Sequence, residues 1–566
     1  MFTPKYISIF LLLFLFAIGI KGQEIALEIQ GKDSLETTII DQINYQKKHE
    51  VLKTIRTEVE QVNGKLQQIG YINLQVNPLK KVNDSLYLSQ FKLGEKYSAV
   101  KVYYDKASLP FESIKRMGLS GNSEYFTLPF NQAEEILQQL SITITDLGRP
   151  FSTLSLTEIQ PNDDGQLEAQ LQIISSDFRV VDSIIIKGYE KFPKSFIKHF
   201  SRIKTGQVFN KSELDKKTEE LKSLDFVNIS RNPEVLFTED QTILYMYLEK
   251  QNSNRFEGFL GFSTDEETGK FELDGDISLA LKNNLNYGES LIIKYKNTGN
   301  DQQHFNAQAK LPFLFSSPVG LKLSLDLFKQ DSSYTTTAQT AAITYQVNSK
   351  IEIEGGYKYK SSNNLLENST VIGANFENFE SNFATFGIEF LDRSLNNPLF
   401  PFKTNLNLNI GVGKRDREAE SDSQQSVEFA GEHIFELDQR NSFLLSNKTA
   451  VLFSKNYLSN ELFRFGGIHS VRGFEENSLR ASLFSGIQTE YRFLLSPSLY
   501  AHTIIDYAHL ENATNSEKNN FYGIGFGLGL ETKAGLLKVA FANGKTDGES
   551  FKFEHTKVHI SLQASF

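Results

Sequence analysis

One arginine in an apolar setting is the residue of this sequence best placed to make a specific charge contact. Arg472 lies in the stretch RFGGIHSVRGFEENSL, between Val471 on one side and Gly473 and Phe474 on the other. A guanidinium group presents its N–H donors in a planar fork, which fits a carboxylate better than an ammonium group does. The sequence therefore raises the question of which carboxylates Arg472 contacts, and the answer depends on the surrounding elements.

The composition excludes several classes of protein. The chain has 566 residues, of which 40% are hydrophobic and 23% charged, so it is a folded chain long enough for several domains. Its net charge is −10 and it has no Lys/Arg-rich run, so we expect no nucleic-acid partner. The absence of cysteine excludes disulfides, thiolate catalysis, Cys-based zinc sites and a lipid-modified N-terminal cysteine.

The first residues have the pattern of a secretory signal peptide. Lys5 precedes an apolar run from Ile7 to Ile20, and the small residue Gly22 follows it. The run is shorter than the roughly 20 residues that a membrane-spanning helix needs, and no later segment is apolar for that length. We therefore expect residues 1–22 to be cleaved on export, and an uncleaved anchor is the alternative.

The N-terminal half alternates between strand and helix patterns. Its clearest unit has a strand ending at Gly188, a short helix, and a second helix with Leu214, Leu221 and Leu224 on one face. Two strands close this unit, which gives the order β-α-α-β-β. The same order recurs twice upstream with little sequence identity, the first copy being the least clear. The three predicted domains are residues 23–94, 95–177 and 178–251. Unrelated α+β linker domains are the alternative.

Residues 252–566 predict an antiparallel β-barrel of the outer-membrane type. In VGLKLSLDLF and TNLNLNIGVG every second residue is apolar, and Lys, Asp, Asn, Ser or Gly stands between. Segments of roughly 10–12 residues joined by alternating short and long connectors are typical of such barrels. Among sheets, only a closed one pairs every backbone group within hydrocarbon. Seven short connectors predict 16 strands with both chain ends in the periplasm, and a soluble sandwich is the alternative.

The end of the chain supports the same prediction. In the last strand Val558, Ile560, Leu562 and the terminal Phe566 face one way, which is typical of bacterial outer-membrane barrels. We interpret residues 361–381 as an outer loop, with a further strand pair as the alternative.

The face of the terminal strand sets which residues of the neighbouring strands point inward. Glu490 in LFSGIQTEYRFL and Asp506 in LYAHTIIDYAHL then project into the barrel lumen from adjacent strands. We expect the loop of residues 454–482 to fold into the lumen and to set Arg472 against both carboxylates. Alternatively, Arg472 is a solvated loop charge, the two acids line the lumen without a partner, or the contact is purely structural.

A row of glycines follows one strand further along. These four residues share the lumenal face of YGIGFGLGL: Gly523, Gly525, Gly527 and Gly529. Glycine in a strand often marks the close approach of another backbone, so we expect the folded-in loop to lie against this row. The row lacks the third glycine of a G-x-G-x-x-G nucleotide loop, and no helix follows it.

The loop motif Val471-Arg472-Gly473-Phe474, preceded by FGG, resembles the V-R-G-F/Y tip of the sixth outer loop in the Omp85 superfamily, which includes the surface antigen D15 type. The upstream repeats look like its POTRA domains, and LDRSLNNPLFPFKTN resembles a recurrent periplasmic turn of its barrel. The resemblance covers nearly the whole mature chain. It implies a 16-stranded barrel whose loop arginine contacts acidic residues on the following strands, and Glu490 and Asp506 occupy the matching places.

Within the superfamily, three POTRA domains before a barrel look most like the TamA branch. BamA types usually carry more repeats, and lipid-anchored Tam proteins need a cysteine that this chain lacks. Two-partner secretion (TpsB-like) transporters carry two repeats, a plug helix and a linker. That branch stays open because the first repeat is weakly marked.

The resemblance implies an outer-membrane protein that assembles or translocates client proteins, with no enzymatic site, cofactor or metal. Its expected partners are outer-membrane lipid, extended client polypeptides and a periplasmic or inner-membrane (TamB-like) protein at the POTRA domains, which would add a client strand to an exposed sheet edge. The barrel would open laterally between its first strand, NRFEGFLGFST, and its last, Lys557–Phe566. A passive channel is a second class. An enzyme is a third, although the sequence has no H-x-x-x-H, G-x-S-x-G or D-x-D-x-D-G motif.

Overall fold

The computed structural model describes residues 24–162, 166–264, 271–297, 302–366, 376–394, 397, 399–418, 420–532 and 535–563. The predicted signal peptide lies outside the described residues. Contacts divide the chain into two compact units, one of residues up to Val180 with Val208–Lys211, the other of Val181–Gln207 and Ser212–Phe566. Among the described residues, no helix is long and apolar enough to cross a bilayer.

The first domain is an α/β unit around a small sheet. Its elements are β1 (Ile25–Gln30), α2 (Ser34–Asp41), β2 (Lys48–His49), α3 (Leu52–Gln68), β3 (Gln75–Val76), β4 (Lys80–Asn83) and β5 (Leu86–Lys92). The sequence predicts one long helical region through Leu66 here, but the structure has the two helices α2 and α3. Helix α2 is separate because Asp33 caps it by accepting from the N–H of Glu36 at 2.9 Å. The segment YINLQVNPL, Tyr71–Leu79, predicts a strand, but only two of its residues form β3.

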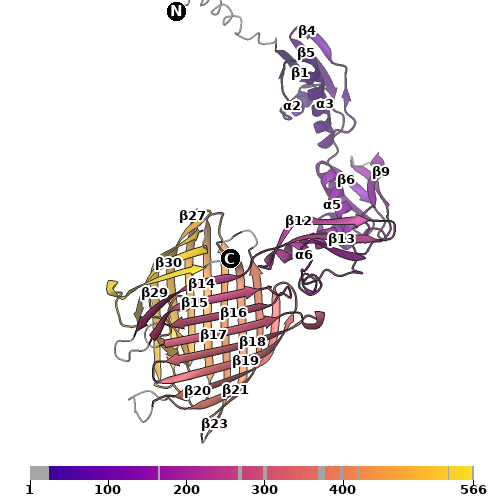
Figure 1. Cartoon of the computed structure of the whole chain (residues 1–566). Coiled ribbons are helices and arrows are strands. Elements are labelled where there is room, and N and C mark those ends of the chain that lie inside the picture. Colours follow the sequence, from indigo (N-terminus) through magenta and orange to yellow (C-terminus); the bar gives the residue numbers. More distant parts are fainter. Residues whose placement is uncertain are drawn as a thin grey trace, which may run out of the picture. The chain divides into compact units, whose positions relative to one another are not determined.

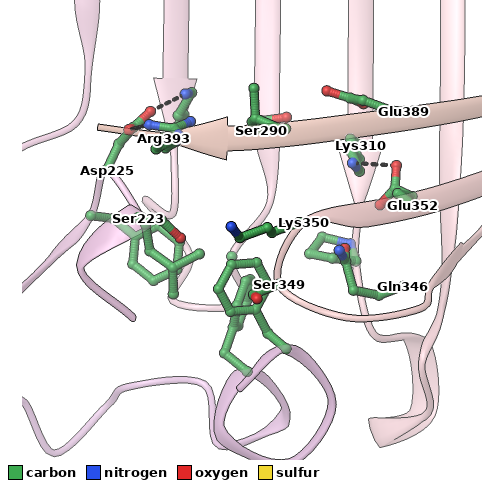
Figure 2. Close-up of a pocket in the computed structure, with 18 of the residues that line it drawn as sticks. Ser223, Asp225, Ser290, Lys310, Gln346, Ser349, Lys350, Glu352, Glu389 and Arg393 are labelled. Carbon is green, nitrogen blue, oxygen red and sulfur yellow. Dashed lines mark hydrogen bonds and ion pairs between the residues drawn. The ribbon is translucent and has the colours of Figure 1, made fainter. Parts of the chain in front are cut away.

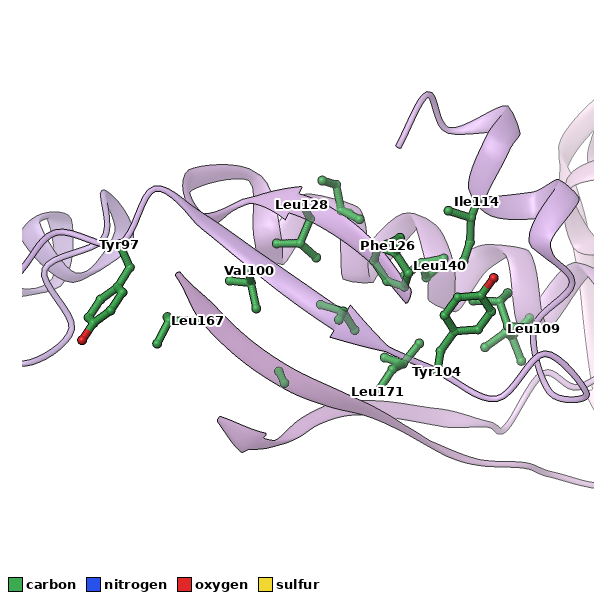
Figure 3. Packing of buried hydrophobic residues seen from close by; sticks show 14 residues of the cluster. Tyr97, Val100, Tyr104, Leu109, Ile114, Phe126, Leu128, Leu140, Leu167 and Leu171 are labelled. Carbon is green, nitrogen blue, oxygen red and sulfur yellow. The ribbon is translucent and has the colours of Figure 1, made fainter. Parts of the chain in front are cut away.

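The second domain has an additional hairpin between its two helices. Its elements are β6 (Ala99–Tyr103), α4 (Phe111–Arg116), β7 (Ser120–Gly121), β8 (Tyr125–Pro129), η1 (Phe130–Gln132), α5 (Ala133–Asp146), β9 (Thr153–Pro161) and β10 (Leu167–Ile174). The sheet order is β7-β8-β6-β10-β9, so the expected order β-α-α-β-β is wrong here by two strands. Phe126 and Leu128 of the unpredicted strand β8 complete the core with Val100 and Leu140 (Figure 3).

The third domain has the predicted order β-α-α-β-β. Its elements are β11 (Ser183–Gly188), the π-helical turn η2 (Phe196–Phe200), α6 (Lys211–Glu220), the 3₁₀ turn η3 (Leu221–Ser223), β12 (Val227–Phe237) and β13 (Thr242–Lys250). Leu214 and Leu221 are buried, whereas Leu224 is half-buried. The sheet order β11-β13-β12 leaves β11 and β12 as edge strands.

The C-terminal half forms a 16-stranded sheet, which confirms the predicted barrel (Figure 1). The strands are β14 (Arg255–Thr264), β15 (Phe271–Lys282), β16 (Ser290–Asn297), β17 (Gln302–Leu311), β18 (Val319–Gln330), β19 (Tyr334–Gln346), β20 (Ile351–Asn364), β21 (Phe379–Arg393), β22 (Phe402–Asp416), β23 (Ser421–Glu436), β24 (Asn441–Phe453), β27 (Leu483–Ser496), β28 (Leu499–Asn512), β29 (Glu517–Thr532), β30 (Gly535–Thr546) and β31 (Thr556–Gln563). Each strand pairs antiparallel with the next, and all seven predicted short connectors join neighbours.

The strands are more variable in length than expected, from 8 residues in β16 to 16 in β23. Hydrogen-bonded pairing continues past the apolar stretch, where alternation no longer marks it. For this reason β20 extends to Asn364 and β21 begins at Phe379, so strand replaces both ends of the outer loop expected at 361–381.

The two faces of the sheet differ as the alternation requires. Val412 of β22 and Phe526 of β29 are 56% and 62% exposed on the outer face, where lipid surrounds a barrel. On the lumenal face the ammonium group of Lys322 forms an ion pair with Glu354 at 2.8 Å. The barrel therefore has an apolar exterior and a charged interior.

The first and last strands of the sheet form its seam. β14 and β31 lie side by side. Among the described residues, however, no backbone ladder joins them, and they stand at the two ends of the strand order.

Candidate functional site: a loop fastened inside the barrel

The connection between β24 and β27 contains the motif that the sequence singles out. It includes a short hairpin of β25 (Phe463–Phe465) and β26 (Leu479–Ala481), and the motif lies between these two strands. Gly473 has a φ of +94°, a left-handed conformation that favours glycine. A Cβ on Gly473 would lie 2.4 Å from the backbone N of Gly544 in β30, so the loop tip touches the barrel wall.

The structure places Arg472 against both predicted carboxylates. Its backbone N–H and its Nε both donate to Oδ2 of Asp506 at 2.9 Å, and Nη2 donates to Oδ1 at 2.5 Å. Nη1 donates to Oε1 of Glu490, and Nη2 also donates to the carbonyl oxygen of Thr489 at 3.4 Å. The guanidinium fork therefore spans β27 and β28, as planar bidentate pairing requires.

This contact is shielded from solvent. The exposed fractions of Arg472, Glu490 and Asp506 are 4%, 9% and 2%. Removing one partner from a buried pair commonly costs about 3–5 kcal/mol, because the other charge stays buried and unpaired. The interpretation of Arg472 as a solvated loop charge is therefore wrong.

A second arginine that the sequence analysis did not single out completes the charge cluster. Arg492, two residues along β27 from Glu490, donates from Nε to Oε2 of Glu490 at 2.7 Å. Nδ1 of His502 lies 3.8 Å from the same oxygen. Two arginines thus face two carboxylates, and Glu490 lies between the guanidinium groups. Alternation along LFSGIQTEYRFL points Arg492 inward with Glu490, but it gives no sign of which group Arg492 contacts.

Apolar contacts hold the residues that flank Arg472. Val471 is fully buried, and the ring of Phe474 packs edge-on against Phe521 of β29 with 5.2 Å between ring centroids. Phe465 of the loop hairpin stacks on Phe484 of β27 at 3.7 Å. These contacts form one buried cluster on the wall, so the loop is packed as well as paired.

The glycine row is explained only in part by the loop. A Cβ on Gly523 would lie 2.4 Å from the carbonyl oxygen of Arg472, so this glycine does admit the loop. On Gly525 it would meet the backbone of the neighbouring strand β30, and on Gly527 and Gly529 it would meet His502 and Tyr500 of β28. The expectation that the loop lies along the whole row is therefore wrong. Only Gly523 admits the loop, whereas Gly527 and Gly529 make room for side chains of the adjacent strand β28.

A second fastening lies on β22 and β23, and sequence reasoning missed it. Glu461 of the loop accepts from Nη1 of Arg415 at 2.5 Å and from Nε2 of Gln424 at 3.0 Å. Arg415 is fully buried and also pairs with Asp422. The loop is thus held at its tip by β27 and β28 and near its start by β22 and β23.

Charged residues just after the motif reach strands on both sides of the seam. Glu475 forms an ion pair with Lys557 of β31 at 2.8 Å, and Glu476 lies 3.8 Å from Nζ of Lys296 in β16. Both pairs are partly exposed, and such pairs contribute little to stability. They place the loop beside the seam.

The C-terminal strand carries the predicted outward pattern over its described part. Val558 and Ile560 of β31 are 53% and 70% exposed. The side chain of Leu562 and the whole of Phe566 lie outside what the structure describes.

The third domain contacts the periplasmic mouth of the barrel through a buried carboxylate. Asp225 pairs with Lys282 at the end of β15 and with Arg393 at the end of β21, two strands well separated in the sheet (Figure 2). Burial by itself raises the pKa of Asp225, but the charges of Lys282 and Arg393 outweigh it and lower the pKa to about 2. Asp225 is therefore ionised at any physiological pH and bridges two sides of the mouth.

Aromatic packing reinforces this junction. Phe196 of η2 packs edge-on against Phe313 in the β17–β18 turn, with ring centroids 4.7 Å apart. The hydroxyl group of Tyr189 donates to Oδ1 of Asn286 in the β15–β16 turn at 2.6 Å. A Cβ on Gly288 would lie 2.1 Å from the ring of Phe196, so this turn fits the domain closely.

The β21–β22 turn reaches up into the lumen. Phe400 is buried and packs edge-on against Tyr500 with ring centroids 4.9 Å apart. The guanidinium group of Arg492 lies 4.7 Å from the centroid of the Phe400 ring. This turn therefore contacts the charge cluster that holds the loop tip.

The described residues contain no group of three or more His, Asp or Glu side chains that could hold a metal ion. The arrangement around Arg472 suits a mechanical fastening, since each carboxylate is occupied by arginine donors.

The fold and the fastened loop define a class: outer-membrane barrels that carry POTRA domains on the periplasmic side. The Omp85 superfamily domain matches residues 281–557, and the POTRA family, described as a surface antigen variable number repeat, matches residues 180–250. The chain belongs to the Omp85 superfamily. It lies in the outer membrane with its POTRA domains in the periplasm, and the superfamily acts generally in outer-membrane protein assembly or secretion.

Solved structures share the fold at low identity. CdiB from Acinetobacter baumannii is 16% identical with a TM-score of 0.51, and the match covers 90% of this chain and 97% of that one. CdiB from Escherichia coli is 14% identical with a TM-score of 0.50, covering 90% and 98%. BamA from Haemophilus ducreyi lacking POTRA domains 1–3 is 14% identical with a TM-score of 0.49, covering 82% and 99%. No curated protein sequence matches the chain. At these identities the likeness to the two CdiB structures extends to the fold alone.

Proposed function

We propose that this protein is a TamA-like outer-membrane insertase or translocase that works without an enzymatic site, a cofactor or a metal. The observation that carries the proposal is the buried contact of Arg472 with Asp506 and Glu490. A passive pore does not need an external loop fastened inside its lumen, where the loop narrows the path. The fastened loop therefore favours a barrel that passes clients through its wall over one that conducts through its lumen.

The seam supports the same proposal. Edge strands present N–H and C=O groups that another chain can pair with. β14 and β31 lie beside one another without a ladder over their described residues. A client strand would pair with one of these edges as it enters the membrane.

The periplasmic domains would deliver the client. Extended segments bind exposed sheet edges through main-chain hydrogen bonds. In the second domain β9 is an edge strand of the sheet, and the third domain offers β11 and β12. Clients and a periplasmic or inner-membrane (TamB-like) partner would bind there.

Arg472→Ala tests the proposal directly. We expect the variant to reach the outer membrane in normal amount, because the 16-stranded sheet is unchanged, but to reduce the level of its clients. Arg440→Ala, in the exposed β23–β24 turn, is the matched control. Normal client levels with the Arg472 variant, measured by outer-membrane proteomics, would contradict the proposal.

Depletion of the protein separates this role from the alternatives. Loss of a subset of outer-membrane proteins is expected, whereas loss of all barrels would indicate a BamA role. A single missing secreted protein would indicate two-partner (TpsB-like) secretion. A large, steady conductance that POTRA deletion leaves unchanged would indicate a passive channel.

A further inference from the structure

The first strand of the third domain has an open edge. β11 stands at the end of the sheet order, so only one of its sides is paired with β13. The N–H of Asp182 donates to the carbonyl oxygen of Thr242 at 3.0 Å, toward β13. Because backbone direction alternates along a strand, the N–H and C=O groups of Ser183, Ile185 and Lys187 point away from the sheet. The start of this edge is taken by residues 206–208, because the N–H of Gly206 donates to the carbonyl oxygen of Val181 at 2.8 Å. The groups of Ile185 and Lys187, further along β11, are available to an added strand.

A groove runs beside this edge. Its volume is about 420 Å³, and it lies between β11 and the turn η2. Four isoleucines form its apolar lining: Ile184, Ile186, Ile197 and Ile203. Ile184 and Ile186 are only half-buried, although they face the same way as the buried core residues of β13. The core of the domain is therefore open at this edge.

The rim of the groove is basic. Lys194, Lys198 and Lys204 line it and are exposed, and no carboxylate is among the residues that line it. Within the described part of the chain, no ion pair joins any of the three ammonium groups to an acid. Ser316, from the β17–β18 turn of the barrel, lines the groove as well, and its carbonyl oxygen lies 2.8 Å from Nε2 of His199. An occupant of the groove would therefore contact the barrel.

We propose that this groove binds an extended acidic segment of a client or partner protein as an added strand on β11. The backbone of the segment pairs with the outward groups of the strand. On its groove-facing side, apolar side chains contact the isoleucines and carboxylates contact the three lysines. The charge of the rim selects acidic over basic segments. This inference rests on the proposed function and identifies the chemistry of the client segment.

The test uses the full-length protein in detergent micelles and a fluorescent peptide that repeats Val-Thr-Glu-Thr three times. In an extended strand this repeat places Val and Glu on one face. We expect binding by fluorescence anisotropy, and at least about tenfold weaker binding after Lys194→Glu, Lys198→Glu and Lys204→Glu combined. The control combines Lys32→Glu, Lys53→Glu and Lys65→Glu in the first domain. It has the same net charge and should bind the peptide as the unmodified protein does.

Two further peptides separate strand addition from charge attraction. A version with N-methylated alternate amides cannot pair along one edge and should bind weakly. A version with Lys in place of Glu should also bind weakly. Equal binding of either version, no binding of the Glu peptide, or an equal loss in both triple variants would overturn the proposal.

An anionic lipid is the competing occupant. Vesicles containing phosphatidylglycerol that displace the peptide from the unmodified protein but do not bind the groove variant would overturn the proposal in favour of a lipid site. The proposed function is tested separately by client levels in cells. If the groove variant loses the peptide but clients assemble normally, while Arg472→Ala impairs them, the groove inference fails and the proposed function stands.

Discussion

Neutralising Asp225 should loosen the third POTRA domain from the barrel by an amount that the structure fixes. Asp225→Asn keeps the size of the side chain and removes the charge that faces Lys282 and Arg393. The pKa of Asp225 is lowered from 3.8 to about 2. One pKa unit corresponds to about 1.4 kcal/mol, so the ionised group stabilises the junction by about 2 kcal/mol. The ratio of docked to undocked domain should fall about 30-fold.

The pH dependence has a definite sign. Because the folded pKa of Asp225 lies below its ordinary value of 3.8, the stabilisation is complete above pH 5 and is lost as the pH falls from about 4 to about 2. The difference between the Asn variant and the unmodified protein should therefore be constant from pH 5 to pH 8. It should shrink only in strong acid.

Hydrogen exchange of the β15–β16 turn measures this opening. The third domain contacts this turn at Asn283 and Asn286 through Tyr189, and at Gly288 through Phe196, and exchange at these residues should follow undocking. We expect exchange about 30-fold faster in Asp225→Asn at pH 7 and no change in Asp240→Asn, an exposed acid of the same domain. Exchange within twofold of the unmodified rate, or equal acceleration in both variants, would refute the reasoning.

Two further predictions concern the loop. Gly523→Ala should displace the loop tip at a cost of about 1–3 kcal/mol, because the added Cβ would lie 2.4 Å from the carbonyl oxygen of Arg472. Protease cleavage of the loop should therefore increase. Unchanged cleavage would contradict the contact between Gly523 and the loop. Glu461→Gln leaves Arg415 buried with Asp422 as its remaining acid and should destabilise the barrel by about 3 kcal/mol. A lower temperature of heat-modified migration on semi-native gels would show this, with the exposed Glu418→Gln as the control that should migrate unchanged.

The sequence predicted the barrel well because alternation reports directly on the environment of each face. Val412 is apolar because it faces lipid. Lys322 and Glu354 are charged because they face the polar lumen, where they form an ion pair. The same two-residue alternation predicts that Glu490 and Asp506 point inward. Arg472 of the loop was the predicted partner of both carboxylates. The inward positions of both carboxylates were therefore predictable from the alternation of the strands that carry them.

The other features of the site depend on which side chains surround an inward-facing residue. Alternation along one strand does not show this. Gly527 and Gly529 make room for His502 and Tyr500, side chains on another strand, so no pattern within β29 distinguishes them from Gly523. The pairing of Glu461 with Arg415 joins an irregular loop to a strand 46 residues away, and neither residue lies in a motif. The extra hairpin β7–β8 is only a few residues long, too short for a periodic signal.

The position of Glu490 between two guanidinium groups has a mechanical consequence. From Asp225 the contacts run to Arg393, along the β21–β22 turn to Phe400, and from there through Arg492 to Glu490 and the loop arginine. These contacts form a path inside the barrel, from the third domain at the periplasmic mouth to the tip of the inward-folded loop. A shift of the third domain at Asp225 would therefore act on the loop arginine through packed side chains of the lumen, and the lipid-facing wall need not move.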